Sequence, residues 1–140
     1  MLTDICRRAA ADFGDADAYR TEQGWAIGFR DLDQAADEAA AGLSARGIRP
    51  GSVVALVLPS VVDYVVLYLA LARLGAITAG LNPKLRPREI EECLAVLDPA
   101  LVIATDELMA PAVATRFPTE HLEPGGDAAT VADPFRVRGA

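Results

Sequence analysis

Side chains able to do nucleophilic chemistry are few in this chain of 140 residues, and none stands in a known catalytic pattern. The one histidine, His121, has no acid or nucleophile that the sequence assigns to it, so a surface or linker role is favoured over acid–base catalysis. None of the three serines, Ser44, Ser52 and Ser60, lies in a G-x-S-x-G elbow. We therefore assign no catalytic residue.

The sequence predicts neither a metal site nor a phosphate loop. Cys6 and Cys93 are far apart and lack metal-ligand spacing, and Cys93 falls in an apolar helical stripe, which favours a reduced core thiol. Neither G-x-G-x-x-G nor G-x-x-x-x-G-K-[ST] occurs, and Gly125-Gly126 is too isolated to form a phosphate cradle. We assign no metal-binding or cofactor-binding residue.

Two polar groups remain, and each has a simple structural interpretation. An acidic set shares one face of a predicted helix and is expected to be solvated: Asp31, Asp33, Asp37 and Glu38. A second set follows a predicted strand end, where a ligand could lie, although turn chemistry and a solvated surface are favoured: Asn82, Lys84 and Arg86.

Composition excludes several classes of protein. The chain is 52% hydrophobic and 24% charged, which is typical of one globular domain. A net charge of −7 and the lack of any basic run argue against a nucleic-acid surface. The first fifteen residues, MLTDICRRAAADFGD, have no apolar core of a signal peptide, so a cytoplasmic location is expected.

The most apolar stretch is GSVVALVLPSVVDYVVLYLALARLGAI, residues 51–77, and it could be a membrane span or a soluble core. Val53–Leu58 is predicted to be a buried strand that Pro59 ends. A helix of about 14 residues follows and ends at Gly75, which at roughly 21 Å is too short for a membrane. Ser60 and Asp63 have the spacing of a helix start and are predicted to cap it.

The same alternation of strand and helix continues on both sides of this stretch. Downstream, the pattern predicts strands at Ala76–Gly80 and Leu101–Ala104, a helix at Pro87–Leu97 and a weaker helix at 106–116. Upstream, it predicts a helix at Thr3–Phe13, a hairpin over 16–29 and a helix at Phe29–Arg46. The fold class is therefore α/β, a parallel sheet with flanking helices. Residues 1–122 are predicted to form one subdomain and 123–140 a linker.

Two segments carry a family resemblance: FRDLDQAADEAAAGLSARGIRPGSVVALVLPS and LALARLGAITAGLNPKLRPREIEECLAVLDPALVIATDE. They resemble the N-terminal region of adenylate-forming enzymes, the acyl-CoA synthetase and AMP-binding superfamily. The residues that match the family pattern in order and spacing are Phe29, Leu32, Leu43, Gly47, Ile48, Pro50, Gly51, Val54, Pro59, Leu74, Gly75, Ala76, Asn82, Pro83 and Leu85. The departures are Gly28, Asp31, Ser52, Ser60 and Gly80, which leave the subfamily open.

The resemblance implies the N-terminal subdomain of the acyl-CoA synthetase-like fold and part of an ATP-dependent acid:CoA ligase, of the kind used in fatty acid metabolism. Such enzymes form an acyl-adenylate and then a thioester, so ATP, Mg²⁺ and CoA are implied for the complete enzyme. The family's phosphate loop, roughly T-S-G-T-T-G-x-P-K, does not occur in these residues, and the chain is expected to be inactive alone.

Other interpretations stay open. N-P-K-L after the second strand favours acyl or aryl acids over an amino-acid-activating adenylation domain. A non-catalytic docking module would associate with the missing remainder of the enzyme, or with itself, through an exposed apolar seam. A free-standing nucleotide-binding domain is disfavoured, because its first strand-to-helix turn, Leu58-Pro59-Ser60, has no glycine.

Overall fold

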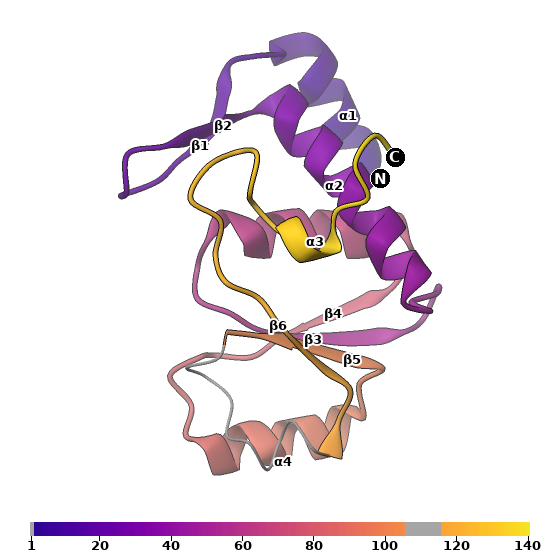
Figure 1. The fold of residues 1–140 in the computed structure, drawn as a ribbon. Coiled ribbons are helices and arrows are strands. Elements are labelled where there is room, and N and C mark those ends of the chain that lie inside the picture. Colours follow the sequence, from indigo (N-terminus) through magenta and orange to yellow (C-terminus); the bar gives the residue numbers. More distant parts are fainter. Residues whose placement is uncertain (1, 106–115) are drawn as a thin grey trace.

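The computed structural model describes residues 2–105 and 116–140, and Figure 1 shows the arrangement of their elements. In chain order these are α1 (Leu2–Phe13), β1 (Asp17–Arg20), β2 (Ala26–Gly28), α2 (Phe29–Ala45), β3 (Val53–Val57), α3 (Val62–Arg73), β4 (Ile77–Gly80), α4 (Pro87–Leu97), β5 (Leu101–Ala104), β6 (Thr119–His121) and the short 3₁₀ helix η2 (Asp133–Phe135). The predicted helix at 106–116 lies outside the described residues, except for Arg116.

The main sheet has four parallel strands in the order β4-β3-β5-β6. Its first strand, β3, is internal and pairs with both β4 and β5, so the chain passes outward to one edge and then crosses back to the other. A separate antiparallel pair is formed by β1 and β2. The predicted α/β class with a parallel sheet is confirmed.

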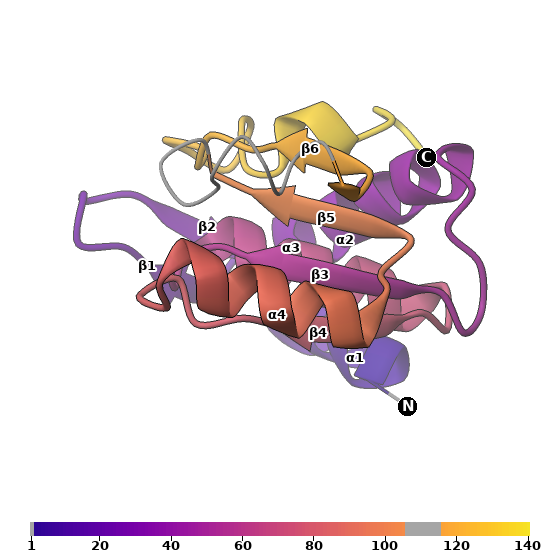
Figure 2. The ribbon, with the colours of Figure 1, turned by 90° about the horizontal axis from the view of Figure 1, so that it is seen from below.

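Helices cover the sheet on both faces, as Figures 1 and 2 show. The larger cluster of buried side chains lies between the sheet, α2 and α3, and a smaller one lies between α4 and strands β3 and β5. The apolar stretch at 51–77 divides into β3 and α3, at the centre of the larger cluster, as predicted. None of the helices in the described ranges is long and apolar enough to cross a membrane.

Local sequence explains the helix boundaries well. The predicted apolar face of α2 is buried throughout, at Leu32, Ala35, Ala36, Ala39, Ala40 and Leu43. Gly47 and Gly75, predicted as stops, have φ of +87° and +69° directly after α2 and α3, a conformation that favours glycine.

The predicted cap at Ser60 is wrong. α3 begins at Val62, with Val61 at the N-cap and no side-chain hydrogen bond capping the helix. The Asp63 carboxylate accepts hydrogen bonds from the backbone N–H groups of Gly125 and Ala132, far along the chain. The spacing Ser-x-x-Asp was therefore a chance match, because the carboxylate is used by a distant segment.

The acidic face of α2 is not solvated as predicted, since only Asp31 of the four is exposed. The Arg73 guanidinium, 5% exposed, donates to the Asp33 carbonyl at 2.8 Å and to the Asp37 carboxylate at 2.9 Å. Arg7 also donates to Asp37, at 3.0 Å. These arginines bring α1 and α3 against α2, so the carboxylates are internal ion-pair partners.

The C-terminal segment, residues 122–140, packs back onto the helices. Leu122, Val131, Ala132 and Phe135 are buried, and Figure 1 shows the segment running beside α3 and α2. Nothing in its apolar pattern predicts this packing. The division at residue 122 and the onward path toward a phosphate loop stay predictions.

Candidate functional site

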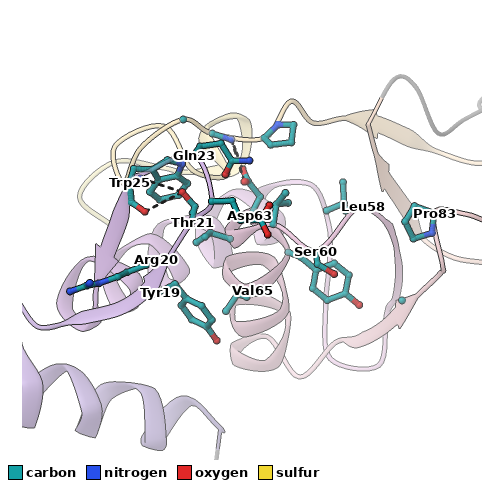
Figure 3. Close-up of a pocket in the computed structure, with 18 of the residues that line it drawn as sticks. Tyr19, Arg20, Thr21, Gln23, Trp25, Leu58, Ser60, Asp63, Val65 and Pro83 are labelled. Carbon is teal, nitrogen blue, oxygen red and sulfur yellow. Dashed lines mark hydrogen bonds between the residues drawn. The ribbon is translucent and has the colours of Figure 1, made fainter.

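A cavity of about 1090 Å³ lies at the carboxyl ends of β3 and β4. In parallel α/β sheets this edge is where ligands bind. Three walls surround the cavity: the β1–β2 hairpin turn at 19–25, the strand ends with the start of α3, and residues 124–126 of the C-terminal segment. Figure 3 shows the side chains that line the cavity.

The hairpin wall is held by Thr21, at the end of β1. The Thr21 hydroxyl donates to the Trp25 carbonyl at 3.1 Å and accepts from the Trp25 N–H at 3.3 Å. Gly24 has φ of +95°, which lets the chain reverse between these residues. The turn therefore presents Tyr19 and Trp25 to the cavity on a fixed loop.

The strand-end wall is shaped by a close approach of Tyr64 to Gly80. A Cβ placed on Gly80 would lie 2.2 Å from the Tyr64 hydroxyl oxygen, so the tyrosine occupies the room that any side chain there would need. A side chain at position 80 would therefore require Tyr64 to move. Asn82 lines the same wall, and its side-chain oxygen accepts from the Lys84 N–H at 2.9 Å, as expected of a turn.

The third wall depends on Asp63. Its fully buried carboxylate accepts from the Gly125 N–H at 3.1 Å and from the Ala132 N–H at 2.8 Å. Burial raises the pKa of Asp63, and the two amide hydrogen bonds limit that rise. Asp63 is thus a structural residue that fixes the C-terminal segment over the cavity.

The lining of the cavity does not bring a serine and a histidine together. Ser60 lines it, but His121, at the end of β6, does not, so no serine–histidine pair forms there. The Gly126 N–H donates to the Thr130 hydroxyl at 3.1 Å, and the Gly125 N–H is taken by Asp63. Both glycine amides therefore already have hydrogen-bond partners within the chain.

ATP and Mg²⁺, which the family resemblance implies, do not fit the residues present. Within residues 2–105 and 116–140, no group of three or more His, Cys, Asp or Glu side chains could hold a metal ion. Arg20 is the cationic side chain that lines the cavity, and it already donates to Asp17 at 2.9 Å. We derive no reaction step from these residues.

Of the strand-end residues that sequence singled out, only Asn82 reaches the cavity. Lys84 and Arg86 do not line it, and the Arg86 backbone N–H, at the start of α4, instead donates to the Glu89 carboxylate at 3.2 Å. Sequence reasoning missed the hairpin turn and residues 124–126 as walls. The hairpin over 16–29 was predicted, but not as a wall of a site, and residues 124–126 are placed by a contact with Asp63, 62 residues from Gly125.

A match to a protein-family model shows to which family the chain belongs. The model described as AMP-binding enzyme matches residues 6–134, which is most of the chain and all three walls of the cavity. The chain belongs to the AMP-binding enzyme family.

Several curated relatives are CoA ligases. A probable CoA ligase of Humulus lupulus, CCL9, is 33% identical over 131 residues, covering 90% of this chain and 25% of the relative. The oxalate–CoA ligase of Arabidopsis thaliana is 32% identical over 124 residues, covering 86% and 24%. The chain therefore spans about a quarter of the length of these relatives.

Solved structures agree with the fold. A structure described as a putative long-chain-fatty-acid CoA ligase from Rhodopseudomonas palustris matches with a TM-score of 0.81 and 26% identity, covering 96% of this chain and 37% of that one. AMP-binding chains of this kind share the parallel sheet and flanking helices described above, so the expected N-terminal subdomain architecture is confirmed.

Proposed function

We propose that this chain forms the N-terminal part of an ATP-dependent acid:CoA ligase, and that the 140 residues are inactive alone. One observation carries the proposal: the AMP-binding model matches residues 6–134, while the chain spans only about a quarter of a CoA ligase such as CCL9. The cavity at the strand ends fits this role, because it offers walls for a site and no complete set of reacting groups.

The proposed reaction class is acyl-adenylate formation followed by thioester formation, with ATP, Mg²⁺ and CoA bound through the remainder of the enzyme. Relatives named for 4-coumarate and for long-chain fatty acids favour an acyl or aryl acid over an amino acid as substrate. In this proposal the described residues build one side of the site, since Trp25, Leu58 and Val65 give it an apolar lining. A cytoplasmic location stays a prediction from composition.

The inactivity is tested by ATP/pyrophosphate exchange. The purified chain is incubated with ATP, Mg²⁺, labelled pyrophosphate and a panel of aliphatic, aryl and amino acids, and the oxalate–CoA ligase of Arabidopsis thaliana with oxalate serves as the positive control. We expect no acid-dependent exchange above the buffer rate. Saturable exchange that depends on one of the acids would sink the claim that the chain is inactive alone.

A second measurement tests the membership in a larger ligase. Sequencing the coding region that follows codon 140 should reveal an in-frame Ser/Thr/Gly-rich loop similar to T-S-G-T-T-G-x-P-K. An immediate stop codon, with no such motif in a neighbouring reading frame, would instead favour an independent docking module.

A further inference from the structure

Helix α4 covers only part of its face of the sheet. Its buried residues Ile90 and Leu94 pack against Ala55 of β3 and Val102 of β5, within the smaller core cluster. Among the described residues, edge strand β4 is less well covered on this face, and its Ile77 is 53% exposed. Parallel sheets are normally buried on both faces, so this bare strand face is unusual.

A hollow of about 570 Å³ lies between α4 and β4. We call it the α4–β4 groove and define its apolar side chains as Ala79, Leu81, Leu85, Cys93, Val96 and Leu97. Ala79 and Leu81 share the strand face of Ile77, because side chains two residues apart point to the same side. Val96 is 87% exposed, although it borders an apolar surface.

The groove has an acidic rim. Glu89 and Glu92 line it from α4, where residues 89, 92, 93 and 96 fall on one side of the helix by their spacing of three and four. Glu92 pairs with Arg88 at 3.4 Å, but both side chains are strongly exposed, so this ion pair is weak and open to exchange. An apolar surface with a negative rim is complementary to an apolar stripe flanked by positive charge.

We propose that the α4–β4 groove is the docking site of an amphipathic helix that carries an apolar stripe flanked by Lys or Arg and belongs to the remaining part of the ligase. A helix fits better than a strand, because the hollow lies beside α4 on the sheet face, where a second helix packs at about 8–10 Å from the first. That the helix comes from the rest of the ligase rests on the proposed function. The chain covers 25% of CCL9, so the remaining part of such an enzyme would have to pack against these residues.

The test uses the 140-residue chain and a designed peptide. The probe is a lactam-bridged helix of about 15 residues with a Leu/Ala stripe and Lys flanks, and its matched control has the same stripe with Glu flanks. Binding is measured by anisotropy of the labelled peptide. In a Cys6→Ser background, the rate of thiol modification at Cys93 reports whether the groove is covered.

We expect saturable binding of the Lys-flanked peptide, at least about tenfold tighter than that of the Glu-flanked one, and slower modification of Cys93. Val96→Asp should weaken binding at least about tenfold, and because Val96 is so exposed, this change should leave the circular dichroism spectrum intact. Tyr68→Asp, at an exposed position on α3 across the sheet, is the matched control and should leave binding unchanged.

Three results would overturn the proposal. The first is no saturable binding of either peptide, and the second is equal binding of both, which would remove the charge argument. The third is a concentration-dependent dimer in sedimentation that Val96→Asp dissociates, which would assign the groove to a second copy of the chain. These measurements need no ATP, so they are independent of the exchange assay.

Discussion

Glu38 is one buried side chain that connects α2 to the C-terminal segment. It lies in the middle of α2, and its carboxylate is 5% exposed and pairs with the Arg136 guanidinium at 2.8 Å. Burial opposes its ionisation, but hydrogen bonds from Gln34, the Gly139 N–H and Arg136 outweigh burial and place the pKa of Glu38 below its usual range. The ionised form is therefore a stabilising contact in the folded chain.

Replacing Glu38 by Gln should destabilise the chain by about 3 kcal/mol at pH 7, because Arg136, also nearly buried, loses its counter-charge. The difference in the free energy of unfolding between wild type and Glu38→Gln depends on pH. Because the pKa of Glu38 is lower in the folded than in the unfolded state, the unfolded state binds more protons at pH values between these two pKa values. The free energy of unfolding therefore rises with pH in this range, and the contribution of Glu38 is lost as the pH falls through its folded-state pKa.

Urea unfolding from pH 3 to pH 7 measures both effects. The difference in the free energy of unfolding between wild type and Glu38→Gln should be largest near neutral pH and should decrease at acidic pH. Asp31→Asn, at an exposed position of the same helix, is the matched control and should change stability by less than about 0.5 kcal/mol. A gap that is constant with pH would contradict the ion-pair explanation.

At the scale of elements, the C-terminal segment is the least expected part of the structure. Its irregular backbone is held by side chains of two helices: Glu38 of α2 and Asp63 of α3. Phe135 is buried, and the Arg46 guanidinium lies over its ring, 4.5 Å from the centroid. The segment thus replaces regular secondary structure with specific polar contacts and one aromatic anchor.

A close approach of two backbones makes this docking easy to break. A Cβ on Gly42 would lie 1.7 Å from the Phe135 carbonyl oxygen, so Gly42→Ala must push the segment away from α2. We expect a loss of about 2–3 kcal/mol and faster limited proteolysis within residues 122–140.

The matched control for this change is Gly126→Ala. It makes the same substitution within the segment, where an added Cβ meets nothing within 4 Å, and should leave stability and cleavage unchanged. If Gly42→Ala were cleaved no faster than wild type, the segment would not depend on this contact.

At the scale of the molecule, the sheet has a protected centre and open edges. β3 and β5 each pair with a strand on both sides, and the Val102 N–H donates to the Pro118 carbonyl at 2.8 Å. On β4, Ile77 and Leu81 donate toward β3, so the alternating Thr78 and Gly80 amides point away from the sheet. Among the described residues, no strand pairs with that edge.

Hydrogen exchange of the isolated chain should follow this arrangement. We expect the Thr78 amide to exchange at least about a hundredfold faster than the Val102 amide, since its N–H has no strand partner. Two-dimensional NMR at dilute protein concentration gives both rates in one sample. Equal protection of the two amides would mean that the β4 edge is covered, and the rates at two protein concentrations would reveal a second copy as the cover.

Most regular elements could be predicted from sequence because their signals are local. α4 was predicted with its observed bounds from Pro87 and the spacing of Ile90 and Leu94, and β5 from four apolar residues. The cavity walls and the roles of Asp63 and Glu38 could not be predicted, because their partners lie 62 to 101 residues away. An acidic residue on a helix has the same local pattern whether it faces water or a distant arginine.

The pairing of Glu38 with Arg136 also determines when the chain can finish folding. These residues are separated by 98 positions, so the entropy of closing a long loop must be overcome before the contact forms. During synthesis on the ribosome, the surface of α2 that will receive Phe135 stays uncovered until residue 135 has emerged. Until then the nascent chain exposes apolar surface that binds chaperones and promotes aggregation.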